Sequence, residues 1–92
     1  MYSIASQAIG EFLGTFLLIM SILSSGGNPL VIGATLALIV FLIGKISGGA
    51  VNPAVSLSLY LGGSISWGVF GLFVAVQILG AAAAVYTYNA VA

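Results

Sequence analysis

Few residues of this chain carry groups that could do chemistry. Its only charged side chains are Glu11 and Lys45, and it contains no His and no Cys. We expect no enzyme activity, because no nucleophile–base pair, metal-ligand cluster or phosphate-binding loop can be assembled from the remaining residues. For the same reason we expect no metal ion and no cofactor. One motif has a distinctive spacing: Asn52, Pro53 and Ala54 follow Gly48, Gly49 and Ala50 after one intervening Val.

The Asn52-Pro53 pair is typical of a helix start. Asn caps the free backbone amides, and Pro fits the first helical position without losing a hydrogen bond. The apolar run that follows has about eight residues, or ~12 Å of helix, too short to cross a ~30 Å hydrocarbon core. We therefore expect residues 47–61 to enter the membrane as extended backbone and return as a half-helix. Irregular backbone at that depth is tolerated only inside protein or along a water-filled cavity.

The composition indicates a membrane protein. Hydrophobic residues make up 62% of the 92 residues and charged residues only 2%. A soluble domain of this size needs a polar surface, and a disordered chain needs many charges. Nucleic-acid binding needs basic patches that one Lys cannot supply. We expect an integral membrane protein of the cell membrane, inner or plasma, whose first partner is the lipid bilayer.

Runs between Gly, Pro, Asn and Ser clusters define three spans, at residues 4–23, 30–46 and 66–88. Lys45 lies at the end of the second span, where a lysine can reach the headgroups. Spacings of four between small residues predict close helix contacts, at Gly10 and Gly14, Gly44 and Gly48, and Gly80 and Ala84. The predicted fold is all-α: three transmembrane helices and one re-entrant half-helix, forming a single unit over residues 1–92.

Three motifs resemble those of the aquaporins, or major intrinsic proteins. Residues 47–56, SGGAVNPAVS, resemble the first Asn-Pro-Ala loop of that family. Residues 11–16, EFLGTF, resemble its first-helix motif, and residues 77–81, QILGA, its third-helix motif. The resemblance covers nearly the whole chain, with the motifs in family order. Family members contain two inverted repeats of three spans each, whereas this chain has one, so the resemblance implies half of an aquaporin.

The resemblance implies a role for each motif. Asn52 would donate from its amide into a pore while capping the half-helix; the alternative is a simple cap. Pro53 and Ala54 complete the pore motif, and the carbonyls of Gly48, Gly49 and Ala50 would face the lumen; the alternative is a flexible turn. Glu11, with Gln77, would hold the loop in shape. We prefer this role for Glu11 to a proton relay, which would need further acids or His.

Counting from Asn52, the family's selectivity-filter positions fall on small or apolar residues, namely Ile32, Val40, Gly49 and Val55. A pore built from two copies of this chain would lack an Arg, a His and an aromatic ring at its constriction. The resemblance therefore implies passage of linear polyols, other small neutral solutes or gases, or weak water flow.

One repeat cannot enclose the family's pore, in which two half-helices meet at the midplane. Orientation depends on the Lys and Arg bias between the two sides, and here that bias rests on Lys45 and the N-terminal amine. Copies could therefore insert both ways and pair as an antiparallel homodimer, and four such dimers would match the family's tetramers. Two alternatives remain: half of a split channel with a different partner chain, and a non-conducting membrane packing protein.

Overall fold

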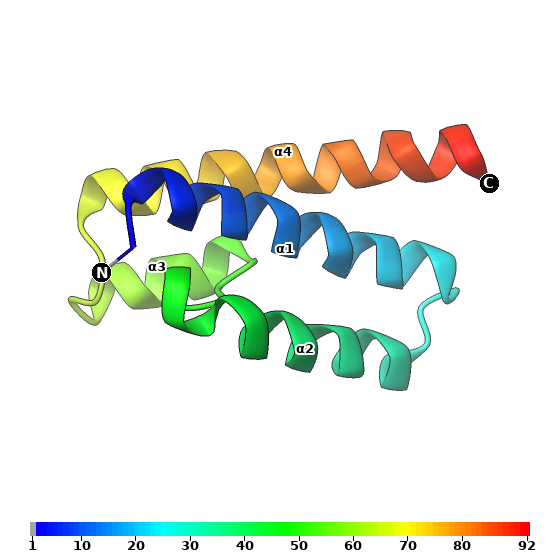
Figure 1. The fold of residues 1–92 in the computed structure, drawn as a ribbon, viewed down its shortest axis with the longest axis horizontal. Helices are drawn as coiled ribbons and strands as arrows, with labels where there is room; N and C mark the ends of the chain where they lie inside the picture. The colour runs from blue at the N-terminus through cyan, green and yellow to red at the C-terminus, as the bar shows by residue number, and fades with distance from the viewer. Residues whose placement is uncertain (1) are drawn as a thin grey trace.

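The computed structural model describes residues 2–92 and is built from four helices (Figure 1). They are α1 (Ile4–Ser24), α2 (Pro29–Ser47), α3 (Pro53–Leu61) and α4 (Trp67–Val91). Helices α1, α2 and α4 are long and apolar enough to cross a membrane, whereas α3 has nine residues. The predicted all-α membrane fold with three spanning helices and one short helix is confirmed. Helix α4 continues to Val91, past the expected end at residue 88, because no Gly or Pro interrupts it.

Each helix begins where a polar side chain caps it. In each of these N-caps, the side-chain oxygen accepts a hydrogen bond from a backbone amide two or three residues further along the chain. The four N-cap residues are Ser3, Asn28, Asn52 and Ser66. Two of these caps are Asn-Pro pairs, which makes the starts of α2 and α3 chemically alike. Helix α2 ends at Ser47 and is followed by the cap residue Gly48, whose φ of 92° is the left-handed conformation that glycine adopts without strain.

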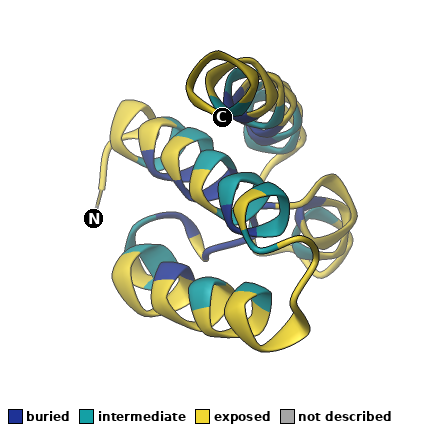
Figure 2. Cartoon of the chain, turned by 90° about the vertical axis from the view of Figure 1, so that its right-hand side faces the viewer, coloured by how far each residue is buried: buried dark blue, intermediate teal, exposed yellow. Residues whose placement is uncertain are grey.

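Helix α1 is the centre of the fold: it packs against α2 on one side and α4 on the other, while α3 packs against α4. The three long helices run along the 39 Å axis of the molecule (Figure 1). Helix α1 begins at one end of that axis and α4 finishes at the other (Figure 1). Figure 2 shows that buried residues lie on the facing sides of the helices and along the loop between α2 and α3. The outer faces are exposed and apolar, as lipid or partner contact requires.

The predicted small-residue contacts are confirmed at two helix interfaces, and of the third pair Gly48 contacts α3, where a Cβ on it would lie 3.6 Å from Leu59, whereas Gly44 has no such contact. A Cβ on Gly14 would lie 3.0 Å from Ile39 of α2, and one on Gly80 would lie 2.6 Å from the Phe12 carbonyl oxygen of α1. Gly44, by contrast, faces only Val40 of its own helix within 4 Å. Gly44 therefore makes no helix contact within residues 2–92, and α1 packs instead against Ile39 and Ile43 of α2.

Candidate functional site

Glu11 is fully buried in α1, and hydrogen-bond donors from three other segments converge on its carboxylate. Its Oε2 accepts from the Ser47 hydroxyl and, at 3.2 Å, from the Ala50 amide. Its Oε1 accepts from the Val51 amide at 2.7 Å and from Gln77 Nε2 at 2.9 Å. A carboxylate can be buried in an apolar fold only when donors satisfy it in this way. Glu11 thereby ties α1 to the end of α2, to the following loop and to α4.

Gln77 of α4 uses both hydrogens of its side-chain amide. Nε2 donates to Glu11 Oε1 and, at 2.7 Å, to the hydroxyl oxygen of Ser56 in α3. This one side chain therefore fixes α3 relative to α1. Ser56 and Ser47, both buried, are not among the site residues predicted from the sequence. The feature of the sequence that could have predicted both residues is a hydroxyl within an apolar segment, since a buried hydroxyl must find a hydrogen-bond partner.

The loop between α2 and α3 has an unusual backbone. Gly48, Gly49 and Val51 have φ values of 92°, 64° and 44°. A β-branched residue seldom adopts a positive φ, so Val51 is strained, and the hydrogen bond that its backbone amide donates to Glu11 Oε1 holds it there. Gly49 and Ala50 are buried whereas Gly48 is exposed.

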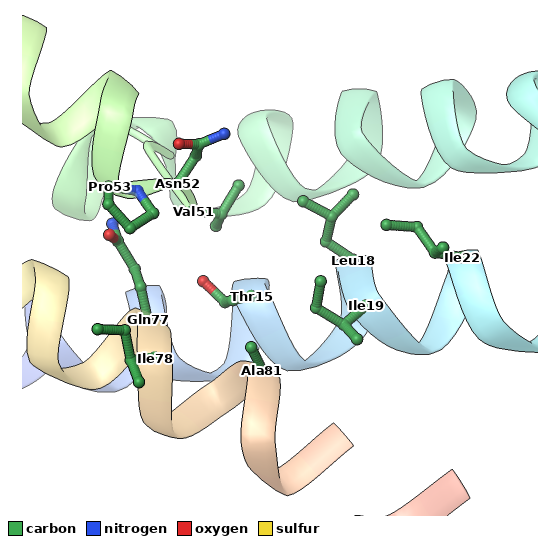
Figure 3. Close-up of a pocket in the computed structure, with 10 residues that line it drawn as sticks. All are labelled: Thr15, Leu18, Ile19, Ile22, Val51, Asn52, Pro53, Gln77, Ile78 and Ala81. Atoms are coloured by element: carbon green, nitrogen blue, oxygen red, sulfur yellow. The ribbon is translucent and has the colours of Figure 1, made fainter. Parts of the chain in front are cut away.

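Asn52 combines a capping role with an exposed amide group. Its Oδ1 accepts from the Ala54 amide at 2.7 Å, which closes the first turn of α3. Figure 3 shows the side chain pointing away from Gln77, Ile78 and Ala81. The start of α3 carries about half a positive charge from its aligned peptide dipoles. Together, the dipole and the amide nitrogen could orient the oxygen of a small neutral solute.

A hollow of about 320 Å³ lies beside Pro53, between α1 and α4 (Figure 3). We call it the α1–α4 hollow; its lining is mostly apolar and consists of Thr15, Leu18, Ile19, Ile22, Val51, Asn52, Pro53, Gln77, Ile78 and Ala81. Two oxygens of this lining, Thr15 Oγ1 and Gln77 Oε1, are buried without a hydrogen-bond partner within residues 2–92. Thr15 is not among the site residues predicted from the sequence, because its position on the inner face of α1 depends on helix packing.

The sequence as a whole matches one protein family. The family described as Major intrinsic protein matches residues 1–92. The chain belongs to the major intrinsic protein family. It is 38% identical over 93 residues to human aquaporin-9, an alignment that covers 86% of this chain and 32% of the relative.

Two further relatives come from distant organisms. The probable aquaporin AqpM of Archaeoglobus fulgidus is 38% identical over 95% of this chain and 39% of its own length. Aquaglyceroporin-2 of Rhizophagus irregularis is 36% identical over 90% of this chain and 31% of its own length. This major intrinsic protein chain thus spans about a third of the length of the curated relatives it matches. No solved structure matches it.

The four filter positions expected from the resemblance to major intrinsic proteins do not lie together in one chain. Val40 and Gly49 are neighbours, since a Cβ on Gly49 would lie 3.2 Å from Val40 Cα. Ile32 lies eight residues before Val40 on α2, which corresponds to about 12 Å along the helix. Val55 is exposed on the first turn of α3. A single chain therefore brings Val40 and Gly49 together, with Ile32 about two turns away along α2.

Proposed function

We propose that this chain is the subunit of a passive channel for water and small neutral solutes, built from two antiparallel copies. The observation that carries the proposal is the short α3, whose Asn52-capped start is held inside the fold by Glu11 and Gln77. With nine residues, α3 is about 14 Å long, whereas α1 with 21 residues is about 32 Å long. One copy thus supplies a half-helix for part of the membrane only, and a second copy supplies the rest.

Antiparallel pairing suits the charge distribution. The chain carries one Lys and one Glu, and Glu11 is buried, so Lys45 is the only charged side chain available to set the orientation. Two copies in opposite orientations are related by a two-fold axis in the membrane plane, so the same surface of each makes the contact. Their α3 helices then meet start to start at the midplane, each presenting Asn52. Four such dimers would form the larger assembly.

Solute passage would use the amide of Asn52 and the start of α3. The amide nitrogen donates to the oxygen of a passing water or alcohol, while the carbonyls of Gly48, Gly49 and Ala50 accept its hydrogens. Two positive helix ends facing one another repel cations and turn each water oxygen toward the midplane. A continuous chain of water-to-water hydrogen bonds is broken there, so protons do not follow.

The constriction would be apolar and would occur twice. Val40, Gly49 and Val55 of one copy would face Ile32 of the other, and the two-fold axis repeats the arrangement at the opposite side. Apolar constrictions wet poorly, which slows water relative to solutes that carry their own apolar surface. We therefore propose glycerol-like polyols and dissolved gases as permeants beside water. One relative is itself named an aquaglyceroporin.

Flux through proteoliposomes that contain only this chain tests the proposal. Stopped-flow light scattering gives the water and glycerol permeabilities, and Asn52→Ala should reduce both. The matched control is Asn28→Ala, because Asn28 caps α2 in front of a proline just as Asn52 caps α3. Equal flux from the wild-type and Asn52→Ala chains would show that Asn52 does not contribute to the solute path.

Two further results decide between this proposal and its alternatives. Folded wild-type protein with no flux above empty liposomes would point to a split channel or a non-conducting packing protein. A tag on the C-terminus should be accessible from both sides of the membrane, and strictly one-sided labelling would contradict antiparallel pairing.

A further inference from the structure

Three aromatic rings pack together where α3 ends and α4 begins. The rings of Tyr60 and Trp67 meet edge to face with their centroids 5.2 Å apart, and the Phe70 centroid lies 5.7 Å from that of Tyr60 and 5.5 Å from that of Trp67. We call Tyr60, Trp67 and Phe70 the ring cluster. Tyr60 is in the last turn of α3 and the other two residues are in the first turn of α4. The cluster therefore joins the ends of two helices, and each ring holds the others in place.

The ring cluster is open on its Trp67 side and has hydrogen-bond donors to offer. Trp67 is 66% exposed, so most of its apolar ring is covered by no part of the chain. The side-chain hydrogen bonds nearest to it in the sequence are made by Ser58 and Ser66, and the Tyr60 hydroxyl and the Trp67 indole N–H donate to no atom within residues 2–92. A partner that suits this surface covers an apolar ring and accepts hydrogen bonds at its edge.

The ring cluster lies at the boundary between a polar turn and apolar helices. The turn, residues 62–66, has the sequence GGSIS, and Ser64 and Ser66 are exposed. It lies at the end of the molecule where α1 begins, and α2, which has Lys45 in its last turn, ends on the same side (Figure 1). A lysine near the end of a span reaches toward the lipid headgroups, and Trp and Tyr collect at the same level of the membrane.

The lipid interface is the partner that these features fit. Ester carbonyl and phosphate oxygens of lipids accept hydrogen bonds, and the adjoining acyl chains cover the apolar face of a ring. The exposed outer faces of the three spanning helices, which contact lipid, continue into the ring cluster without a break in apolar character at Leu61 and Val69. The cluster is therefore placed at the end of an apolar surface that the bilayer already covers.

The length of α3 relates the ring cluster to Asn52. Tyr60 follows Asn52 by eight residues, which corresponds to about 12 Å of helix, and half of a hydrocarbon core measures about 15 Å. Rings at the lipid interface thus bring Asn52 close to the midplane of the bilayer. Helix α4, against which α3 packs, begins inside the ring cluster, so the two helices share one depth.

We propose that the ring cluster anchors the α3–α4 turn in the ester and headgroup layer of the bilayer and thereby sets the depth of Asn52. The partner is the lipid surface itself. This inference goes beyond the proposed channel and does not depend on it, because a single copy or a complex with a different chain is anchored in the same way. In an antiparallel pair, each copy is anchored from its own side, so the two α3 helices start at the same depth.

Trp67 reports its own position, because it is the single Trp of the chain. The wild-type protein is reconstituted with phosphatidylcholine brominated either near the ester groups or near the ends of the acyl chains, and quenching of Trp67 fluorescence is measured. We expect stronger quenching by the shallow bromines. Strongest quenching by the deep bromines would overturn the anchor, and so would no quenching by either, since Trp67 would then face protein or water.

The matched control for the quenching moves the single Trp along the membrane normal. The variant combines Trp67→Phe with Phe41→Trp, since Phe41 is 81% exposed and lies inside α2 rather than at its end. We expect its strongest quenching from the deep bromines. The same depth profile from the wild-type protein and this variant would show that Trp67 has no preference for the interface and would overturn the anchor.

A second measurement tests whether the rings set the depth. A nitroxide on Ser64→Cys reports the depth of the turn by electron paramagnetic resonance, in two bilayers whose hydrocarbon thickness differs by about 5 Å, as natural membranes do. With all three rings present the label should keep its depth below the headgroups. With Tyr60→Leu, Trp67→Leu and Phe70→Leu it should shift by about 2–3 Å, because the two ends of the chain then share the mismatch. Phe41→Leu, which removes an exposed ring outside the cluster, should leave the label in place. Equal shifts with and without the rings, or no shift in either, would overturn the anchor.

Discussion

Gly14 and Val51 lie so close that a Cβ on Gly14 would fall 2.7 Å from Val51 Cγ1. Val51 is 3% exposed and has the strained φ of 44° in the loop that leads to Asn52. Because Gly14 has no side chain, Val51 fits against α1. Val51 cannot move from this position without disturbing the hydrogen bond from its amide to Glu11. Helix α1 therefore positions the loop in two ways, through the contact between Gly14 and Val51 and through the Glu11 carboxylate.

We predict that Gly14 and Val51 are energetically coupled. Gly14→Ala overpacks the contact and Val51→Ala leaves a cavity, so each should destabilise the protein by about 1–3 kcal/mol. The double variant should be more stable than the sum of the two changes implies, by about 1 kcal/mol. Unfolding by SDS in bicelles, followed by circular dichroism at one protein concentration, measures the cycle. If the changes in unfolding free energy of the two single variants add up to that of the double variant, Gly14 and Val51 do not interact energetically.

Glu11→Gln should weaken both the fold and the flux. A glutamine at this position keeps one acceptor oxygen, and its new amide group faces two donors that previously bonded to an oxygen. Loss of two hydrogen bonds to a charged group predicts a destabilisation of about 3 kcal/mol. The same unfolding assay and the glycerol flux measure the effect. Lys45→Gln removes the other charge at an exposed site and should change neither quantity.

Gly80→Ala should separate α4 from α1. The new Cβ would lie 2.6 Å from the Phe12 carbonyl oxygen, and backbone cannot rotate away as a side chain can. We expect a loss of about 1–3 kcal/mol in unfolding free energy. Flux should fall too, because Gln77 is one turn away on α4 and would move from Glu11. Gly71→Ala is the matched control on the same helix, with open space around it, and it should be neutral or slightly stabilising.

Val40→Thr should raise water permeability if Val40 lines an apolar constriction. The substitution keeps the shape and adds a hydroxyl, and a hydrogen bond to water of about 1 kcal/mol corresponds to roughly fivefold faster passage. Val31→Thr is the control, since both valines are on α2 and 43% exposed. Stopped-flow shrinkage in a non-permeant osmolyte measures the rate. An equal increase for both variants would place the constriction elsewhere.

Local chemistry made the fold predictable. Hydropathy and length are properties of each segment alone, so the three spans and the short α3 follow from apolar runs between breaking residues. The Asn-Pro cap of α3 follows from its own two residues. The extension of α4 to Val91 was not predicted, because the segment after Ala84 contains no Gly or Pro that would mark one end of the helix.

The candidate site was predictable only in part. Glu11 had to find donors, because no buried carboxylate is stable without them, and the resemblance placed those donors in the loop. The second donation of Gln77 to Ser56 and the hydroxyl of Ser47 could not be predicted, since they depend on which face of each helix turns inward.

The sequence by itself determined the membrane location, the number of spanning helices and the capped start of α3, since each depends on neighbours along the chain. The tertiary structure alone decided that Gly14 contacts Val51, that Gln77 joins α3 to Glu11, and that an apolar hollow remains beside Pro53. It also left two buried oxygens of the hollow's residues, Thr15 Oγ1 and Gln77 Oε1, without a hydrogen-bond partner within residues 2–92. Those features arise from the packing of α1 against α4 and the loop, and packing distances are set by helices that lie far apart in the sequence.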